Sequence, residues 1–286
     1  MNGQELAPAK INLALHVAGR RDDGYHLLDS LVVFARRGDV ISAQPMRGLS
    51  LSITGPEGAG LSAGADNLVL RAARLIGAQD LALQLDKHLP VASGIGGGSA
   101  DAAACLRLIA RLQDRPLPEP REILALGADV PVCLESQPCR MRGIGEQIEP
   151  LRSLPRFAVV MVNPRRTLST PEVFGALTAR DSAPIEDTIP EFEECGAFFE
   201  WLQAQRNDLQ DAACRLAPEI VHVLEVIIRT RDCGLARMSG SGATCFGLYP
   251  DLAAAQRAAE ELRANHPQWW VLASDLASPQ LSRATT

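Results

Sequence analysis

The stretch LPVASGIGGGSADAAACL, residues 89–106, places four glycines within five positions, directly before an alanine-rich segment typical of a helix. Glycine lets backbone N–H groups approach a bound anion closely, and the amino-terminal end of a helix favours negative charge. The stretch is therefore a candidate phosphate-binding loop. On this segment alone, a flexible connector remains the alternative.

Two known phosphate-binding patterns do not fit this loop. The P-loop pattern ends in Gly-Lys-Ser/Thr, and no lysine is present here. The dinucleotide pattern GxGxxG, started at Gly94, requires a glycine where Ser99 stands. We expect Ser99 either to cap the following helix or to bond a phosphate oxygen. Asp101 should point away from a bound phosphate because the two negative charges repel.

Lys10 and Lys87 are the only lysines among the 28 basic residues of the chain. Lysine carries a compact point charge on a flexible stem, which suits a phosphate contact or a proton-transfer site. The alternative is that two lysines occur by chance in a chain whose other basic residues are arginines. Lys10 lies in AKINLALHVAG, whose alternation predicts a strand with Lys10, Asn12 and His16 on one face.

Asp129 lies in LGADVP, residues 126–131, in a turn after a short predicted helix. We expect Pro131 to push Val130 toward an extended conformation and so to fix the direction of the carboxylate. Taken alone, such an aspartate is more often a turn or capping residue than a catalytic one. RMSGSGATCF, residues 237–246, is a second glycine turn, of the kind used where another backbone or a ligand comes close.

The elements that would position these residues follow from hydrophobic periodicity. In the first half, strands are expected at 9–19, 31–35, 39–43, 49–53, 81–86 and 132–135, and helices at 67–78 (capped by Asp66), at 99–112 and in a short segment ending at Leu126. In the second half, strands are expected at 157–162, on both sides of SGSGA and at 269–274, and helices at 171–179, 195–215, 217–231 and 251–264. The pattern predicts an α+β fold with two domains, residues 1–152 and 153–286.

Composition narrows the function classes. The chain has 286 residues with 47% apolar content, enough for one large or two moderate cores. A net charge of −6 argues against a nucleic-acid or anionic-membrane binder, and the apolar runs are too short to span a bilayer. The opening MNGQELAPAK lacks an apolar signal core, so we expect a cytoplasmic protein. Seven cysteines form no CxxC pair and five histidines no HxxxH, so we expect neither a zinc site nor a disulfide framework.

Five motifs in order, PAKINLAL, GRRDDGYH, LPVASGIGGGSADAAA, LGADVP and SGSGATCF, resemble those of the GHMP kinases, the superfamily of galactokinase, homoserine kinase, mevalonate kinase and phosphomevalonate kinase. The resemblance covers roughly residues 7–275. It implies a two-domain GHMP kinase fold, with an ATP-binding N-terminal domain and an active site in the interdomain cleft. It also implies transfer of the γ-phosphoryl group of ATP to the hydroxyl of a small molecule.

The resemblance also assigns residues. It implies Lys10 and Asp129 as the catalytic pair, and Asn67, Leu68 and Lys87 near the adenine. It implies that the ATP phosphates are wrapped by Pro90, Val91, Ala92, Ser93, Gly94, Ile95, Gly96, Gly97, Gly98, Ser99 and Ala100. The alcohol substrate would be bound by Asn12, Tyr25, His26, Thr170, Pro171 and Phe174. We expect ATP to arrive with Mg²⁺, and we name no protein ligand for the metal.

Within the superfamily, the motifs most closely resemble those of a branch of kinases that act in isoprenoid precursor synthesis outside the mevalonate route. The substrate of that branch joins cytidine diphosphate to methylerythritol. Tyr25 and Phe174 stand out in a chain with 4% aromatic residues, and two rings suit stacking of a base. Ordinary packing is the alternative. Val32, Met141 and Arg142 depart from the usual pattern of the branch, which puts substrate affinity in question more than reaction type.

Two other functions stay open at this point. A non-catalytic nucleotide sensor on the same scaffold would be marked by loss of the lysine or the aspartate, and both are present. The second is a sister kinase that acts on mevalonate or homoserine. GYH and Phe174 favour a cytidine pocket and so argue against this second function. We expect a monomer or a homodimer with a small-molecule substrate.

Overall fold

The structure is a computed structural model that describes residues 2–22, 24–178 and 182–277. The chain forms two compact units that alternate along the sequence. The first unit comprises residues 1–10, 37–92 and 96–136, and the second comprises residues 11–36, 93–95 and 137–286. The expected division between residues 152 and 153 therefore falls inside the second unit. Strands β1 (Gly3–Arg20) and β2 (His26–Pro45) contribute residues to both units.

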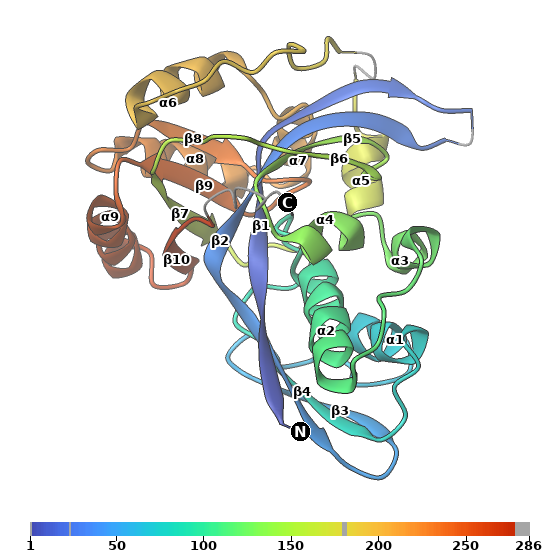
Figure 1. Cartoon of the computed structure of the whole chain (residues 1–286). Coiled ribbons are helices and arrows are strands. Elements are labelled where there is room, and N and C mark those ends of the chain that lie inside the picture. The colour runs from blue at the N-terminus through green and yellow to red at the C-terminus, as the bar shows by residue number, and fades with distance from the viewer. Residues whose placement is uncertain (1, 23, 179–181, 278–286) are drawn as a thin grey trace. The chain divides into compact units, whose positions relative to one another are not determined.

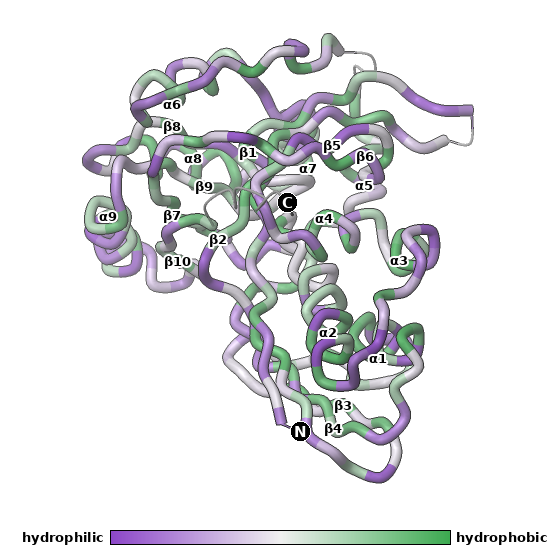
Figure 2. Tube along the Cα trace, in the orientation of Figure 1, coloured by the Kyte–Doolittle hydropathy of each residue, from purple (hydrophilic) through white to green (hydrophobic). Residues whose placement is uncertain are grey.

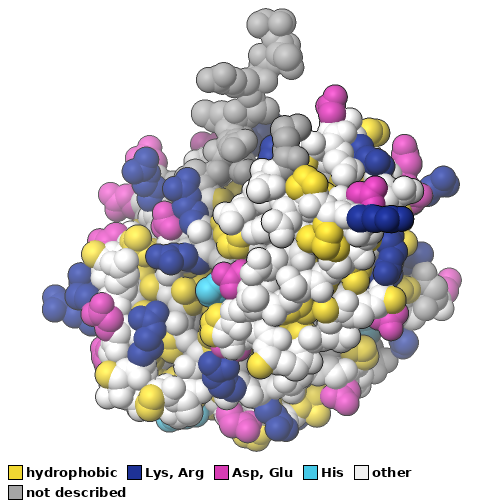
Figure 3. All heavy atoms as spheres, turned by 90° about the horizontal axis from the view of Figure 1, so that it is seen from below, with side chains coloured by type: hydrophobic (Ala, Val, Ile, Leu, Met, Phe, Trp, Pro, Cys, Tyr) yellow, Lys and Arg dark blue, Asp and Glu magenta, His cyan; other side chains and the backbone are white. Residues whose placement is uncertain are grey.

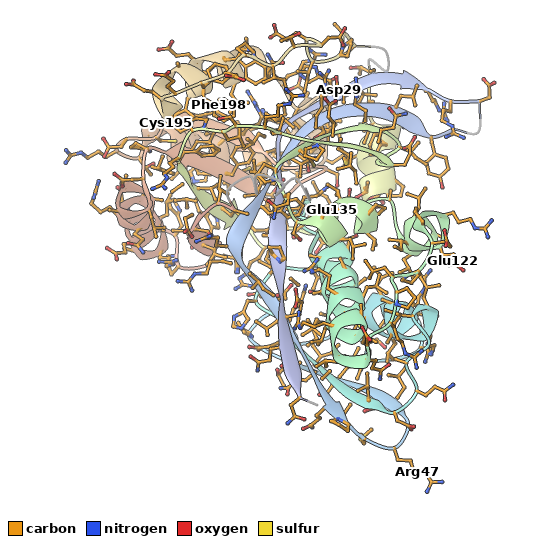
Figure 4. All side chains as sticks on the ribbon, in the orientation of Figure 1. Asp29, Arg47, Glu122, Glu135, Cys195 and Phe198 are labelled. Atoms are coloured by element: carbon orange, nitrogen blue, oxygen red, sulfur yellow. The ribbon has the colours of Figure 1, made fainter. Side chains whose placement is uncertain are left out.

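The strands of the first unit follow the predicted alternation. β4 (Leu81–Asp86), which matches the expected strand, pairs antiparallel with the second half of β2 and parallel with β3 (Leu49–Thr54). Parallel neighbours need a crossover connection, and α1 (Leu68–Leu75) supplies it. Figure 1 shows α1 and α2 (Gly97–Gln113) beside β3 and β4. In Figure 4, Arg47, in the turn between β2 and β3, extends away from these strands.

The helices of the first unit correct one expectation. α3 (Pro120–Leu126) ends where predicted, but residues 130–135 form a helix, α4 (Val130–Glu135), and not a strand. Pro131 lies in the first turn of α4, where a missing N–H costs nothing because no intrahelical acceptor faces it. Val130 is thus helical and not extended. The apolar face of α2 packs against α1 and α4, and its residues Ala102, Ala103 and Cys105 are buried.

The second unit contains two antiparallel sets of strands. The first half of β2 pairs with β5 (Cys139–Gly143), which pairs with β6 (Gln147–Pro150). Four further strands follow the order β10-β7-β9-β8, with the bounds β7 (Ala158–Asn163), β8 (Leu235–Met238), β9 (Cys245–Tyr249) and β10 (Trp270–Asp275). All residues of β7 and β9 are buried, as the uninterrupted apolar sequence of β7 predicts. Figure 2 shows this four-stranded sheet mostly in the hydrophobic colour.

Within the described residues of the second unit, the helices are α5 (Thr170–Gly175), α6 (Cys195–Ala204), α7 (Gln210–Leu216), α8 (Glu219–Arg229) and α9 (Leu252–Asn265). Figure 1 shows α8 and α9 against the four-stranded sheet. The expected helix 195–215 is two helices. The break between them lets the side chain of Asn207 donate to the carbonyls of Met238 and Gly240, both at 2.8 Å. The predicted start of α9 is confirmed, since Asp251 accepts from the backbone N–H of Ala254.

A buried ion pair fastens an irregular segment of the second unit. The guanidinium of Arg140 on β5 donates to both carboxylate oxygens of Asp29 on β2, at 2.8 and 2.7 Å. It also donates to the three carbonyls of residues 185–187. Figure 4 marks Asp29 on its strand. Removing one partner would leave the other charge buried and unpaired, which would destabilise the protein by about 3–5 kcal/mol. The ion pair therefore holds this segment in place.

The surface carries charges of both signs. On the face drawn in Figure 3, Lys and Arg side chains alternate with Asp and Glu and form no area of a single sign. Among the described residues, no helix is both long and apolar enough to cross a membrane. All seven cysteines are free thiols, and Cys105, Cys133, Cys139 and Cys245 are buried.

Candidate active site

Lys10 and Asp129 meet in the first unit. The ammonium nitrogen Nζ of Lys10 lies 2.8 Å from the carboxylate oxygen Oδ1 of Asp129. The two residues that the resemblance pairs therefore lie within ion-pair distance of each other. The side chain of Lys10 is 4% exposed whereas that of Asp129 is 38% exposed, so the carboxylate is the accessible member of the pair.

The start of α4 directs the Asp129 carboxylate. Asp129 occupies the residue before α4, with φ −87° and ψ −7°, and its carbonyl accepts the helical hydrogen bond from Cys133 N at 3.1 Å. Its side chain makes no capping bond to α4. An aspartate here usually caps the helix. In this protein the carboxylate turns to Lys10 instead. Its direction thus comes from the helix start, and not from an extended Val130.

Gly96 brings the amino-terminal end of α2 against Lys10. Its φ is +65°, in the left-handed region, and a Cβ at this position would lie 3.2 Å from Cβ and 3.3 Å from Cε of Lys10. Gly96, and not Ser99, is the capping residue of α2, which corrects one of the two expectations for Ser99. The first N–H groups of a helix lack intrahelical partners, and they favour an anion. An ammonium and a helix amino terminus thus lie side by side.

Lys87 lies in a buried cluster of three charges. Its Nζ donates to Asp39 Oδ2 at 2.5 Å and to Asp101 Oδ2 at 2.8 Å, and all three side chains are almost fully buried. Burial is the main cause that raises the pKa of Asp101 to about 7, and the Lys87 ammonium works against it. The pKa of Lys87 is raised because the two carboxylates outweigh the effect of burial. Asp101 is thus buried and paired with Lys87.

This cluster lies under the first turn of α2. A Cβ on Gly97 would come within 3.1 Å of Lys87 Nζ and 3.9 Å of Asp39 Oδ2. Asp39 Oδ1 also accepts from the backbone N–H groups of His88 and Leu89, at 2.5 and 2.8 Å. The cluster therefore joins β2, the end of β4 and the start of α2 at the base of the glycine loop.

Asn67 and Leu68 lie at the start of α1, next to the same loop. Asn67, and not Asp66, caps α1, because its Oδ1 accepts from Val69 N at 2.9 Å. A Cβ on Gly98 would lie 3.6 Å from Leu68 Cδ1. The three residues assigned to the adenine thus all lie in the first unit, around the first turn of α2.

Ser93, Gly94 and Ile95 belong to the second unit, where they contact the second glycine turn. Thr244 N donates to Ser93 O at 3.1 Å, and Ser239 Oγ donates to Gly94 O at 3.1 Å. A Cβ on Gly94 would lie 2.4 Å from Ser239 O. The close backbone approach predicted for the second glycine turn is confirmed. Ile95 is fully buried, whereas Val91 is exposed.

Asn12 is a fully buried amide next to this turn. Its backbone N–H donates to Ser239 Oγ at 3.1 Å, and its Nδ2 donates to Ser30 Oγ at 2.7 Å. Its Oδ1 has no hydrogen-bond partner within the described part of the chain. Because a buried acceptor without a partner costs free energy, Asn12 Oδ1 is a position where a ligand donor would be stabilising.

The remaining substrate candidates also lie in the second unit. The rings of His26 and Phe174 stack with centroids 4.7 Å apart and an interplanar angle of 23°. Thr170, at the start of α5, shares a 2.8 Å hydrogen bond with Ser241 of the second glycine turn, and Pro171 follows it in the first turn. Tyr25 is 58% exposed. The ring that stacks on Phe174 is thus His26, while the ring of Tyr25 stays largely open to solvent.

Sequence reasoning missed several members of this arrangement. No local sequence pattern marks Asp39, because it pairs with Lys87, which lies far away in the sequence and which the fold brings next to it. Ser30, whose hydroxyl accepts from the Asn12 side chain, lies in none of the motifs, and Ser239 lies in the second glycine turn without having been assigned a contact to Asn12. Lysine scarcity was the useful signal, since both lysines pair with aspartates at the glycine loop.

Comparison with known proteins identifies the family of this chain. The model for the N-terminal domain of GHMP kinases matches residues 67–141, and that for their C-terminal region matches residues 189–268. The 4-diphosphocytidyl-2-C-methyl-D-erythritol kinase of Cereibacter sphaeroides is 55% identical over 269 residues, which cover 94% of this chain and 97% of that protein. The kinase of the same name from Paracoccus denitrificans is 53% identical over 277 residues, covering 97% and 98%.

Solved structures give the same result. A crystal structure of 4-(cytidine 5'-diphospho)-2C-methyl-D-erythritol kinase is 33% identical, with a TM-score of 0.75 over 96% of this chain and 100% of that chain. The L. major mevalonate kinase shares the fold, with a TM-score of 0.68 at 16% identity. A mixed helix and sheet fold with both GHMP domains defines a small-molecule phosphotransferase. The chain belongs to the GHMP kinase family and, within it, to the family of 4-diphosphocytidyl-2-C-methyl-D-erythritol kinases.

Proposed function

We propose that this protein transfers the γ-phosphoryl group of ATP to the 2-hydroxyl of 4-diphosphocytidyl-2-C-methyl-D-erythritol, a step of isoprenoid precursor synthesis outside the mevalonate route. The observation that carries the proposal is the 2.8 Å pair of Lys10 and Asp129 beside the amino-terminal end of α2. Relatives at 50–55% identity that carry this name support the choice of substrate.

Phosphoryl transfer depends on positioning and charge stabilisation more than on covalent help from the protein. The phosphates would be held by backbone N–H groups of the glycine loop between Val91 and Ser99 and by the amino-terminal end of α2. Lys10 would neutralise negative charge that develops on the transferred group. We propose that ATP arrives as its Mg²⁺ complex. Asn67, Leu68 and Lys87 would form the side of the first unit nearest the adenine.

Asp129 would accept a hydrogen bond from the 2-hydroxyl and orient its oxygen toward the γ-phosphorus. A new bond forms between that oxygen and the γ-phosphorus, the bond from the γ-phosphorus to the bridging oxygen of ADP breaks, and the hydroxyl proton passes to the carboxylate. The accessible carboxylate and the buried ammonium suit these two roles, because the acceptor must reach the former while the latter supplies fixed charge.

The substrate side of the proposal rests on the second unit. Phe174, already stacked on His26, and the exposed ring of Tyr25 offer aromatic surfaces for the cytosine. Asn12 Oδ1 would accept a hydrogen bond from the substrate. Thr170 and Pro171, at the start of α5, complete the proposed set. We propose that the enzyme works in the cytoplasm as a monomer or homodimer on this small molecule.

The test is an ADP-release assay with the purified protein and three alcohols: 4-diphosphocytidyl-2-C-methyl-D-erythritol, mevalonate and homoserine. We expect the cytidine substrate to give a kcat/KM at least about 10³-fold above the other two, since a site built to hydrogen-bond a group rejects analogues that lack it. Preference for mevalonate or homoserine would assign the protein to a sister kinase. ATP binding without turnover on all three would replace the kinase with a nucleotide sensor.

A further inference from the structure

Arg107, on α2, joins three segments of the first unit through one guanidinium. Its Nε donates to Glu5 Oε1 at 2.9 Å and its Nη2 to Leu6 O at 2.9 Å, both on β1. Its Nη1 donates to the carbonyls of Cys133 and Leu134, at 2.8 and 3.1 Å, in the last turn of α4. The side chain is 21% exposed. Figure 4 marks Glu135, the last residue of α4.

The two elements that Arg107 joins are those that carry the reacting pair. β1 carries Lys10, and α4 begins directly after Asp129. The guanidinium contacts both elements at the ends away from the pair: residues 5 and 6 of β1 precede Lys10, and residues 133 and 134 close α4. Arg107 itself belongs to α2, the helix that begins at the glycine loop.

α4 needs such a contact because it has six residues. A helix of this length is not stable by itself, and its last carbonyls have no partners within the helix. A cation at the carboxyl-terminal end both satisfies these carbonyls and interacts favourably with the helix dipole. Arg107 fulfils both functions, and Ser136 Oγ adds a 2.6 Å bond to Cys133 O.

We propose that Arg107 is a positioning residue that sets the separation of Lys10 and Asp129 by tying α4 to β1. The proposal rests on the proposed kinase function of this pair. If α4 shifts along β1, the carboxylate moves with it, and a displacement of about 1 Å at a reacting group can lower the rate about 10²-fold. Within the described part of the chain, the bonds of Arg107 go to β1 and to the end of α4, and none goes to Lys10 or Asp129.

Arg111, one turn further along α2, is the matched control. It also pairs with Glu5, through Nη1 and Oε2, and it donates to Gln4 O at 2.8 Å. Its bonds therefore end on β1, whereas those of Arg107 continue to α4. Replacing either arginine removes one bond to Glu5. Replacing Arg107 alone also releases α4.

The experiment compares Arg107→Ala, Arg107→Lys, Arg111→Ala and the unchanged enzyme. We measure kcat and the KM of both substrates, together with the stoichiometry of nucleotide binding, so that kcat refers to folded enzyme. For Arg107→Ala we expect kcat to fall about 10²-fold, with both KM values within about threefold of wild type. Arg107→Lys should be nearly as impaired, because one ammonium cannot replace a planar fork of donors. Arg111→Ala should stay within about twofold of wild type.

Rescue separates positioning from a general loss of structure. Millimolar guanidinium ion should raise the kcat of Arg107→Ala at least about tenfold, because the partly exposed site can admit the free ion. Methylammonium should not, and Arg111→Ala should respond to neither cation. If Arg107→Ala fails to fold, Arg107→Lys carries the test, and a crystal structure should show Lys10 Nζ and Asp129 Oδ1 beyond hydrogen-bond distance.

Three outcomes would overturn the proposal: an unchanged kcat in both Arg107 variants, an equal loss in Arg111→Ala, or a loss of kcat that follows the fraction of folded protein. An inactive wild-type enzyme would instead overturn the proposed function. That result is distinct, because it appears before any variant is compared.

Discussion

The ammonium of Lys10 and the carboxylate of Asp129 lie 2.8 Å apart. Both belong to the first unit, and Gly96 holds the start of α2 against the Lys10 side chain. The proposed mechanism uses these two charges as groups that the fold of the first unit fixes in position. Groups fixed in advance stabilise a transition state without reorganising during the reaction.

Replacing either member of this pair should remove most of the turnover. We expect Lys10→Met and Asp129→Asn each to lower kcat by about 10²–10⁴-fold, the range of a positioned acid, base or charge. The dissociation constant of ATP, measured by calorimetry, should stay within a few fold, because the loop and α2 remain. A variant that turns over like wild type would remove its residue from the mechanism.

Much of the scaffold was predictable because it depends on local periodicity. The strand at 81–86 matches β4, and the helix expected at 251–264 corresponds to α9 (Leu252–Asn265). These elements form where side-chain alternation and capping agree. The convergence of Lys10 with Asp129 was predictable only through the five motifs that resemble GHMP kinases, since no local pattern relates the two residues.

The errors lie where a local signal allows two structures. Pro131 suggests an extended Val130, but proline is also compatible with a first helical turn. The helix α4, whose Val132 and Cys133 are buried, packs against α2. The expected helix 195–215 breaks because Asn207 bonds to distant carbonyls. Asp39, Arg107 and Arg140 act through tertiary contacts, which a single sequence does not mark.

The aromatic pair of the second unit predicts a change in substrate affinity. Phe174 stacks on His26 at 4.7 Å. Because stacking on a base contributes about 1–3 kcal/mol, Phe174→Leu should raise the KM for the cytidine substrate about tenfold or more. The KM for ATP, measured with the same preparation, is the internal control and should stay within twofold. Parallel changes in both values would contradict this assignment.

The glycines of the loop predict unequal effects of alanine. Gly96→Ala places a Cβ 3.2 Å from Lys10 in a left-handed conformation, which costs about 1–2 kcal/mol. Gly98→Ala places its Cβ at an ordinary 3.6 Å from Leu68, inside α2, where alanine is the better helix former. Urea unfolding should show a loss of stability in the first variant and none in the second. Equal losses would contradict the packing at Gly96.

The buried charge cluster predicts a pH dependence of stability. Burial raises the pKa of Asp101 from its ordinary value of 3.8 to about 7. Between these values the folded protein holds a proton that the unfolded chain has released, so stability falls as the pH rises from about 4 to 7. Asp101→Asn removes this titration and leaves Lys87 paired with Asp39. The wild type should therefore lose stability relative to Asp101→Asn over this range.

The difference between the two proteins is the quantity to measure, by urea unfolding at several pH values. His16 contributes the opposite slope, because burial lowers its pKa below 6.5 and its contribution is lost as the pH falls. It is present in both proteins, so its effect cancels. Identical pH profiles for wild type and Asp101→Asn would show that Asp101 ionises normally.

The most direct test of the central claim is a crystal structure with a non-hydrolysable ATP analogue and 4-diphosphocytidyl-2-C-methyl-D-erythritol. We predict that the 2-hydroxyl oxygen lies within hydrogen-bond reach of both Lys10 Nζ and Asp129, about 2.6–3.2 Å, and faces the terminal phosphorus. The account would be contradicted if other residues held the hydroxyl next to the terminal phosphorus. In that result, Lys10 and Asp129 would remain paired with each other and distant from the hydroxyl.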